Sequence, residues 1–160
     1  MSIKTSEKHI HILESGNTLL EPLESGVVFP LLVTGSSMLP FLKHKRDTVW
    51  LVKSTEYRHG QILLFRRTNG TFVLHRIRKI FPDGSMLVNG DAQSWCETVS
   101  PEQAVAVVCA VTVRGKKRDC SSLFMRCRDA LWYPTRPVRP VLFRIYSSLH
   151  RILPSSGGNE

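Results

Sequence analysis

The feature that most constrains this chain is a succession of short apolar runs between residues 27 and 113, separated by turn signals. β-Branched residues are frequent in these runs, which favours strands. The runs cover residues 27–33, 48–52, 62–65, 72–80, 86–88 and 104–113. Thr68-Asn69-Gly70-Thr71 lies between two of them and predicts a β-hairpin. We therefore predict a compact, mostly β domain over residues 27–113.

The segments on either side of this domain have a different pattern. Residues 1–26 are largely polar, and Asn17 can cap a short helix that ends near Leu23. From residue 114 the apolar positions recur with a helical period, which predicts a helical extension over residues 114–153. Residues 154–160 have the composition of a disordered tail.

The net charge of +9 is unevenly distributed along the chain. Residues 1–113 carry 12 basic and 10 acidic side chains, whereas residues 114–151 carry 10 basic and 2 acidic ones. Such a basic segment attracts phosphate on anionic lipid or nucleic acid, or else forms a solvated surface. Residues 139–153 form an apolar stripe framed by Arg139, Arg144 and Arg151, and could contact an anionic membrane. Packing on the β domain is the alternative.

Neither a transmembrane segment nor a signal peptide is predicted. The longest uncharged stretch, residues 25–42, spans 18 residues and is interrupted by Gly26, Pro30, Gly35 and Pro40. We therefore expect a cytoplasmic or peripheral membrane protein. The four cysteines match no common zinc-binding spacing, so we predict no metal and no cofactor.

Residues 35–40, Gly-Ser-Ser-Met-Leu-Pro, are the densest cluster of candidate catalytic groups. A serine hydroxyl becomes a useful nucleophile when a base takes its proton and backbone N–H groups face the developing oxyanion. A turn at Gly35 can expose Ser37 and orient such groups. Gly-Ser-Ser is also a common loop sequence, so this cluster alone does not separate a nucleophile from an ordinary turn.

His75 is the candidate base. On a strand it shares a face with Val73 and Ile77, and apolar surroundings lower the pKa of histidine because they disfavour its charged form. A packed core histidine is the alternative interpretation. Asp91 follows the turn at Asn89-Gly90, where it could accept the N–H of His75 or form an Asx turn.

Taken together, five sequence boxes resemble those of type I signal peptidases, in the same order and spacing. They are Ser37-Met38-Leu39-Pro40, residues 47–52, residues 59–65, residues 74–77 and Gly90-Asp91. The third box is similar to the family's Gly-Asp-Ile-Val-x-Phe. The fourth resembles the His-Arg-Ile/Val box of the branch that uses histidine where the better-known bacterial enzymes use lysine.

The resemblance implies a β fold shared with self-cleaving SOS-repressor peptidases, and endoproteolysis of a peptide presented as an extended strand. It places Ser37 as nucleophile, His75 as general base and Asp91 as the acidic group, with the Ser37 N–H in the oxyanion hole. Gly35 stands where many relatives carry a serine that assists the oxyanion, so the hole relies on backbone alone or on Ser36. Gln61 replaces a usual aspartate, and the usual membrane anchor is not seen.

The leading hypothesis is thus a serine endopeptidase that cleaves leader or signal peptides. A DNA-linked regulator of the repressor-peptidase type is the first alternative. About 26 residues precede the β domain, too few for a helix-turn-helix module, and lysine would be expected at position 75, which argues against nucleic acid as a partner. A catalytically inactive binding module is the second, and the joint presence of Ser37, His75 and Asp91 argues against it.

Overall fold

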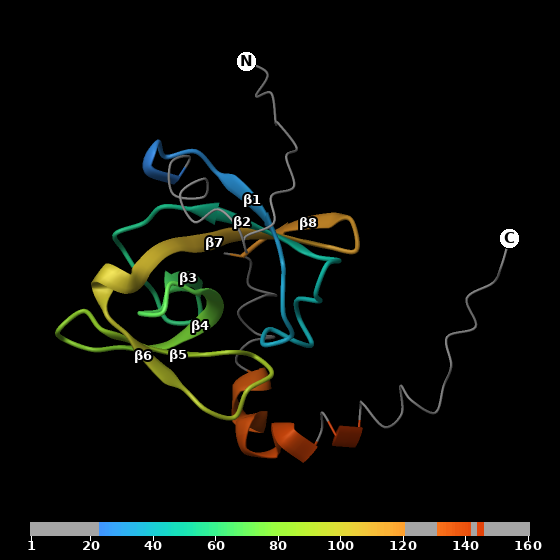
Figure 1. Cartoon of the computed structure of the whole chain (residues 1–160). Coiled ribbons are helices and arrows are strands. Elements are labelled where there is room, and N and C mark those ends of the chain that lie inside the picture. Colours follow the sequence, from blue (N-terminus) through green and yellow to red (C-terminus); the bar gives the residue numbers. More distant parts are fainter. Residues whose placement is uncertain (1–22, 121–130, 142–143, 146–160) are drawn as a thin grey trace, which may run out of the picture.

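A computed structural model describes residues 23–120, 131–141 and 144–145, and its main element is an antiparallel sheet of eight strands. The strand order is β1-β2-β7-β3-β4-β5-β6, and β8 pairs with β7 (Figure 1). The strands are β1 (Phe29–Leu32), β2 (Thr48–Val52), β3 (Ile62–Arg66), β4 (Phe72–Ile80), β5 (Met86–Asn89), β6 (Glu97–Val99), β7 (Ala104–Val113) and β8 (Lys116–Asp119). The prediction of a mostly β architecture is confirmed.

Six of the strands coincide with the six apolar runs of the sequence. The hairpin predicted at residues 68–71 joins β3 to β4, where Gly70 has a φ of 85° and the Asn69 side chain accepts the Thr71 N–H at 3.0 Å. The left-handed conformation at Gly70 explains why glycine follows asparagine there.

Two strands have no apolar signal in the sequence. β6 contains only three residues, and β8 is exposed along its whole length, so neither shows the alternation of a half-buried strand. β8 forms its ladder with residues 110–113 of β7 instead. We predicted that the β domain ends at residue 113, but the sheet continues to Asp119 through a turn at Arg114 and Gly115.

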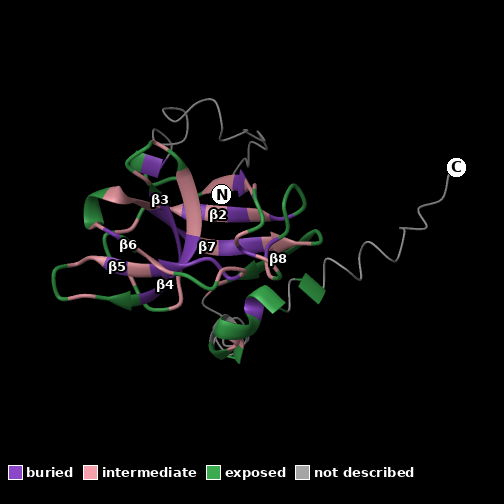
Figure 2. Ribbon diagram, turned by 60° about the horizontal axis from the view of Figure 1, so that its bottom comes forward, coloured by how far each residue is buried: buried purple, intermediate pink, exposed green. Residues whose placement is uncertain are grey.

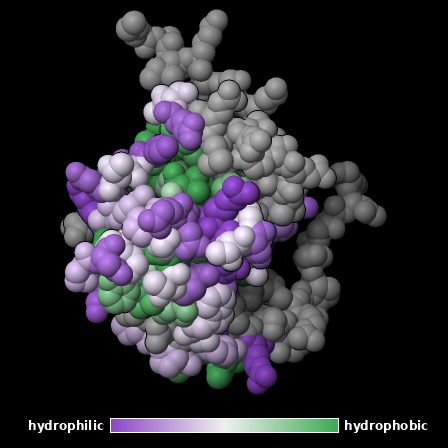
Figure 3. All heavy atoms as spheres, turned by 60° about the vertical axis from the view of Figure 1, so that its left-hand side comes forward, coloured by the Kyte–Doolittle hydropathy of each residue, from purple (hydrophilic) through white to green (hydrophobic). Residues whose placement is uncertain are grey.

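The sheet encloses two hydrophobic clusters, and β3 contributes to both. Ile62 and Leu64 pack in one cluster, whereas Leu63 and Phe65 pack in the other, because successive side chains of a strand point to opposite faces. Figure 2 shows the buried residues concentrated in the strands and the exposed ones in the turns and the C-terminal segment. On the face in Figure 3, hydrophobic side chains gather in a few areas separated by polar ones.

Two 3₁₀ helices are described outside the strands, η1 (Pro101–Gln103) and η2 (Tyr133–Val138). No helix in the described ranges is both long and apolar enough to cross a membrane. The helix predicted from Asn17 lies outside the described residues except for the buried Leu23, and so does most of the predicted stripe over residues 139–153. Arg139, which we considered for contact with an anionic membrane or for packing on the β domain, is completely buried.

Candidate active site

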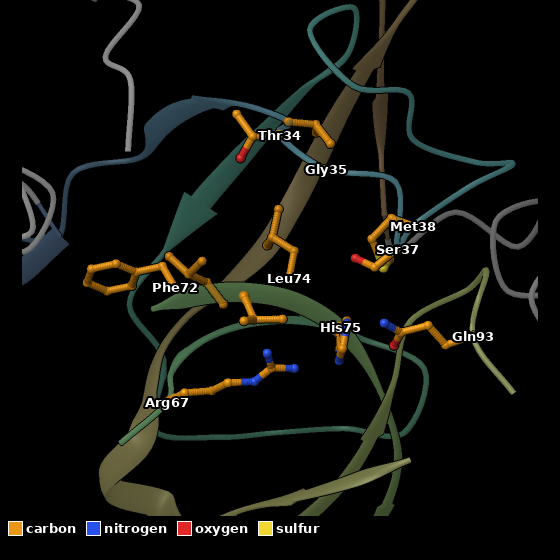
Figure 4. Close-up of a pocket in the computed structure, with 12 residues that line it drawn as sticks. Thr34, Gly35, Ser37, Met38, Arg67, Phe72, Leu74, His75 and Gln93 are labelled. Atoms are coloured by element: carbon orange, nitrogen blue, oxygen red, sulfur yellow. The ribbon is translucent and has the colours of Figure 1, made fainter. Parts of the chain in front are cut away.

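A cavity of about 210 Å³ opens at the junction of the two hydrophobic clusters, and the candidate nucleophile and base both line it. Ser37 comes from the loop after β1, His75 from β4 and Gln93 from the loop after β5. Figure 4 shows the Ser37 hydroxyl, the His75 ring and the Gln93 amide turned towards the same space. Arg67 and Phe72, at the β3–β4 hairpin, line its other side. Residues that are 38 positions apart in the sequence are thus brought to one site.

The loop that carries Ser37 is anchored by the residue after it. Met38 is 2% exposed and belongs to the first hydrophobic cluster, so its burial holds the neighbouring serine at the cavity wall. Gly35 has a φ of 85°, a conformation that a serine at this position would adopt only with strain. Ser36 is not one of the described residues that line the cavity, so this geometry does not support the oxyanion role suggested for it.

The loop after β5 contacts the loop that carries Ser37 through the backbone. The Ala92 N–H donates to the Ser37 carbonyl at 2.8 Å. A Cβ on Gly90 would lie 2.8 Å from this carbonyl oxygen and 2.6 Å from the Gln93 Oε1, closer than real Cβ atoms approach other heavy atoms. Close backbone packing therefore requires glycine at position 90. This contact is a physical reason why the Gly-Asp box and the serine box occur in the same chain.

His75 is 1% exposed and lies against the rings of Phe65 and Trp95, with ring centroids 5.8 and 6.0 Å away. Burial lowers the pKa of His75 to about 4, although the neighbouring carboxylate of Glu97 opposes this shift. At neutral pH the imidazole is therefore uncharged and able to accept a proton. The sequence predicted this direction from the apolar face that His75 shares with its strand neighbours.

The carboxylate beside His75 belongs to Glu97, not to Asp91. The His75 Nδ1 lies 2.8 Å from the Glu97 Oε1, although the carboxylate oxygen stands off the direction required for a well-formed N–H···O hydrogen bond. Glu97 is itself held by Arg67, whose Nε and Nη2 donate to its two oxygens at 2.9 and 2.7 Å. A bidentate pair of this kind fixes the orientation of the carboxylate next to the imidazole.

Asp91 occupies a different place from the one that the sequence analysis gave it. Its buried carboxylate accepts from Arg76 Nη2 at 2.7 Å, from Arg76 Nε at 3.0 Å and from Arg78 Nη2 at 3.0 Å. Arg76 is adjacent to His75 on β4, and adjacent strand residues point to opposite faces of the sheet. Asp91 therefore joins the loop after β5 to β4, while Glu97 faces the imidazole.

The sequence patterns did not point to Glu97, to Gln93 or to Arg67, which holds Glu97. Glu97 lies in a three-residue strand without an apolar pattern, and only the pairing of β6 with β5 brings it near β4. Gln93 lies in a polar loop, yet its Oε1 is buried without a hydrogen-bond partner among the described residues. No local motif marks either residue.

Comparisons with known proteins add no identification. No family model, no curated protein and no solved structure matches this chain. Within the described ranges, no group of three or more histidine, cysteine, aspartate or glutamate side chains is arranged to hold a metal ion.

Proposed function

We propose that this protein is a serine endopeptidase of the signal-peptidase type, which cleaves leader or signal peptides and shares the fold of the signal and repressor peptidases. The observation that carries the proposal is the convergence of Ser37 and a buried, uncharged His75 on one cavity. Two separate sequence boxes supply these residues. A nucleophile and a base that line a common cavity are the minimum that acyl transfer by serine requires.

In the proposed mechanism, His75 removes the proton of the Ser37 hydroxyl as its oxygen attacks the scissile carbonyl. Because Nδ1 lies beside Glu97, Nε2 takes this proton. The imidazolium then protonates the leaving amine, and the acyl group stays on Ser37 until water, activated by His75, hydrolyses the ester. The Glu97 carboxylate stabilises the imidazolium and orients the ring, and the Ser37 N–H stabilises the oxyanion.

The direct test is to incubate the purified full-length protein with a panel of leader peptides that end in small residues. Cleavage by the native chain, with no cleavage by Ser37→Ala, supports a serine endopeptidase. If the panel stays intact and a fluorophosphonate fails to label Ser37 at any pH at which the protein is folded, the proposed activity is wrong.

The pH dependence of cleavage is expected to follow His75. Since only the uncharged imidazole accepts a proton, kcat/KM should be level at neutral pH and fall tenfold per pH unit below about pH 4. A free histidine would give this decline near pH 6.5. Initial rates across pH 3 to 8 provide the measurement, and a decline centred near 6.5 would contradict an uncharged, buried base.

The lowered pKa of His75 also makes the stability of the protein depend on pH, so folding must be measured alongside the rates. Because the unfolded chain binds a proton at His75 more readily than the folded chain does, the free energy of unfolding falls as the pH drops from about 6.5 to about 4. The loss at low pH is about 3 kcal/mol for a shift of this size. Circular dichroism at each pH then separates unfolding from protonation of the base.

Glu97→Gln and Asp91→Asn are expected to have different effects. Glu97→Gln removes the charge that stabilises the imidazolium, so kcat should fall by roughly 10² to 10⁴ while the protein stays folded. Asp91→Asn removes the anion from a buried pair with Arg76 and should lower the free energy of unfolding by about 3 kcal/mol. Turnover per folded molecule and urea denaturation separate the two. A larger loss of turnover in folded Asp91→Asn than in Glu97→Gln would mean that Asp91, and not Glu97, is the acidic group that supports His75.

A further inference from the structure

The described C-terminal segment lies against the loop after β5, and Arg139 makes the main contact. Its guanidinium is completely buried. Nη1 donates to the Asn89 Oδ1 at 2.9 Å and to the Gln93 carbonyl at 2.8 Å, while Nη2 donates to the Trp132 carbonyl at 3.2 Å. One side chain thus ties the two ends of residues 89–93 together and joins them to the C-terminal segment.

Trp132 connects the same segment to both active-site loops. Its Nε1 donates to the Asp91 carbonyl at 2.7 Å. Its ring makes an edge-on contact with Phe41, at a centroid distance of 5.5 Å, immediately after the Ser-Met-Leu-Pro box. The guanidinium of Arg139 lies 5.4 Å from the centre of the Trp132 ring, so the two side chains also support each other.

The loop that these contacts hold, residues 89–93, includes Ala92, whose N–H donates to the Ser37 carbonyl. We propose that Trp132 and Arg139 are positioning residues, which hold residues 89–93 against the nucleophile loop and so set the place of Ser37 relative to His75. The inference rests on the proposed peptidase activity for its catalytic consequence. The contacts by which Trp132 and Arg139 hold residues 89–93, called the clamp below, do not depend on that activity.

The physical reason lies in the donors of Arg139. Its planar guanidinium donates to four acceptors that belong to the loop and the segment, the Gly90 carbonyl at 3.4 Å among them, and no shorter or uncharged side chain reaches all of them in this geometry. Without it, the Asn89 Oδ1 loses its donor, and the Gln93 and Trp132 carbonyls keep only the Asn89 Nδ2 and the Thr135 hydroxyl, so the loop is held less firmly. A displacement of about 1 Å at a reacting group is enough to cost roughly 10² in rate.

The experiment compares full-length Arg139→Met and Trp132→Phe with the native chain, and uses Arg144→Ala as the matched control. Arg144 is an exposed arginine of the same C-terminal region. Two quantities are measured: hydrogen–deuterium exchange of the Ala92 amide, and both the rate and the final extent of Ser37 labelling by a fluorophosphonate. Circular dichroism confirms that each variant is folded.

We expect Ala92 exchange at least tenfold faster in Arg139→Met, and labelling of Ser37 that is about 10 to 100 times slower but still reaches completion. Trp132→Phe, which keeps a ring against Phe41 but loses the hydrogen bond to Asp91, should show smaller changes in the same direction. Arg144→Ala should match the native chain. A fall in the final extent of labelling with an unchanged rate would indicate partial unfolding and overturn the positioning role.

Other outcomes separate the clamp from the proposed activity. If the native chain is not labelled and leaves the leader peptides intact, but Ala92 exchange accelerates in both variants, the clamp stands and the peptidase assignment falls. If Ala92 exchange is the same in all four proteins, the clamp is wrong, whatever the labelling shows. Should Arg139→Met fail to fold, Trp132→Phe decides the question by the same two readouts, since it removes one hydrogen bond and leaves the buried guanidinium in place.

Discussion

Ser37→Ala is expected to lower the rate of peptide cleavage by about 10⁶, close to the uncatalysed background, because it removes the atom that forms the acyl intermediate. The fold should not change, since the hydroxyl points into the cavity while Met38 provides the anchoring contact. Cleavage of a leader peptide, followed by mass spectrometry, measures the effect.

The matched control is Ser36→Ala, one residue earlier in the same turn. Ser36 is not among the described residues lining the cavity, so this variant should keep near-native activity. If Ser36→Ala were inactive and Ser37→Ala active, the nucleophile would be displaced by one residue and the cavity geometry would not describe the working site.

His75→Ala should have an effect of similar size, because a serine without its base is a poor nucleophile at neutral pH and the members of such a site act as a unit. The double variant Ser37→Ala/His75→Ala should therefore be no slower than either single one. Labelling of Ser37 by a fluorophosphonate should also be lost in His75→Ala, which reports on the base without any peptide substrate.

The stability of this variant needs separate measurement, since His75 is buried between aromatic rings. Removing its side chain leaves a void, and a cost of about 2 to 3 kcal/mol is typical for such a truncation. His75→Gln is the second variant, because its larger side chain fills more of the void. A folded His75→Gln that cleaves peptides at the native rate would exclude His75 from the mechanism.

The arrangement around His75 shows how charge is distributed in this site. The imidazole is kept uncharged by burial, and a carboxylate lies next to it, which in the proposed mechanism stabilises the imidazolium. Arg67 holds that carboxylate with two hydrogen bonds. Such a preorganised charge does not need to reorient as the proton moves, which is the main source of electrostatic stabilisation in enzymes.

Much of the fold could be predicted from the sequence because most of its strands are half or fully buried, and burial leaves a pattern of apolar residues along the chain. The β3–β4 hairpin was predictable because Gly70 adopts a conformation that favours glycine. β6 and β8 were not predictable, since backbone ladders hold them and a ladder places no demand on side-chain identity.

For the candidate site, the sequence by itself determined the serine and histidine boxes and the direction of the His75 pKa shift, because both depend on local residues and on the face of one strand. Only the tertiary structure decided which carboxylate stands beside the base. Asp91 was the natural choice from its motif, but strand alternation pairs it with Arg76 and Arg78, and strand pairing brings Glu97 to His75 instead. The buried place of Arg139 was equally inaccessible, because its acceptors are backbone carbonyls and one amide nearly 50 residues earlier, and carbonyls leave no trace in a sequence.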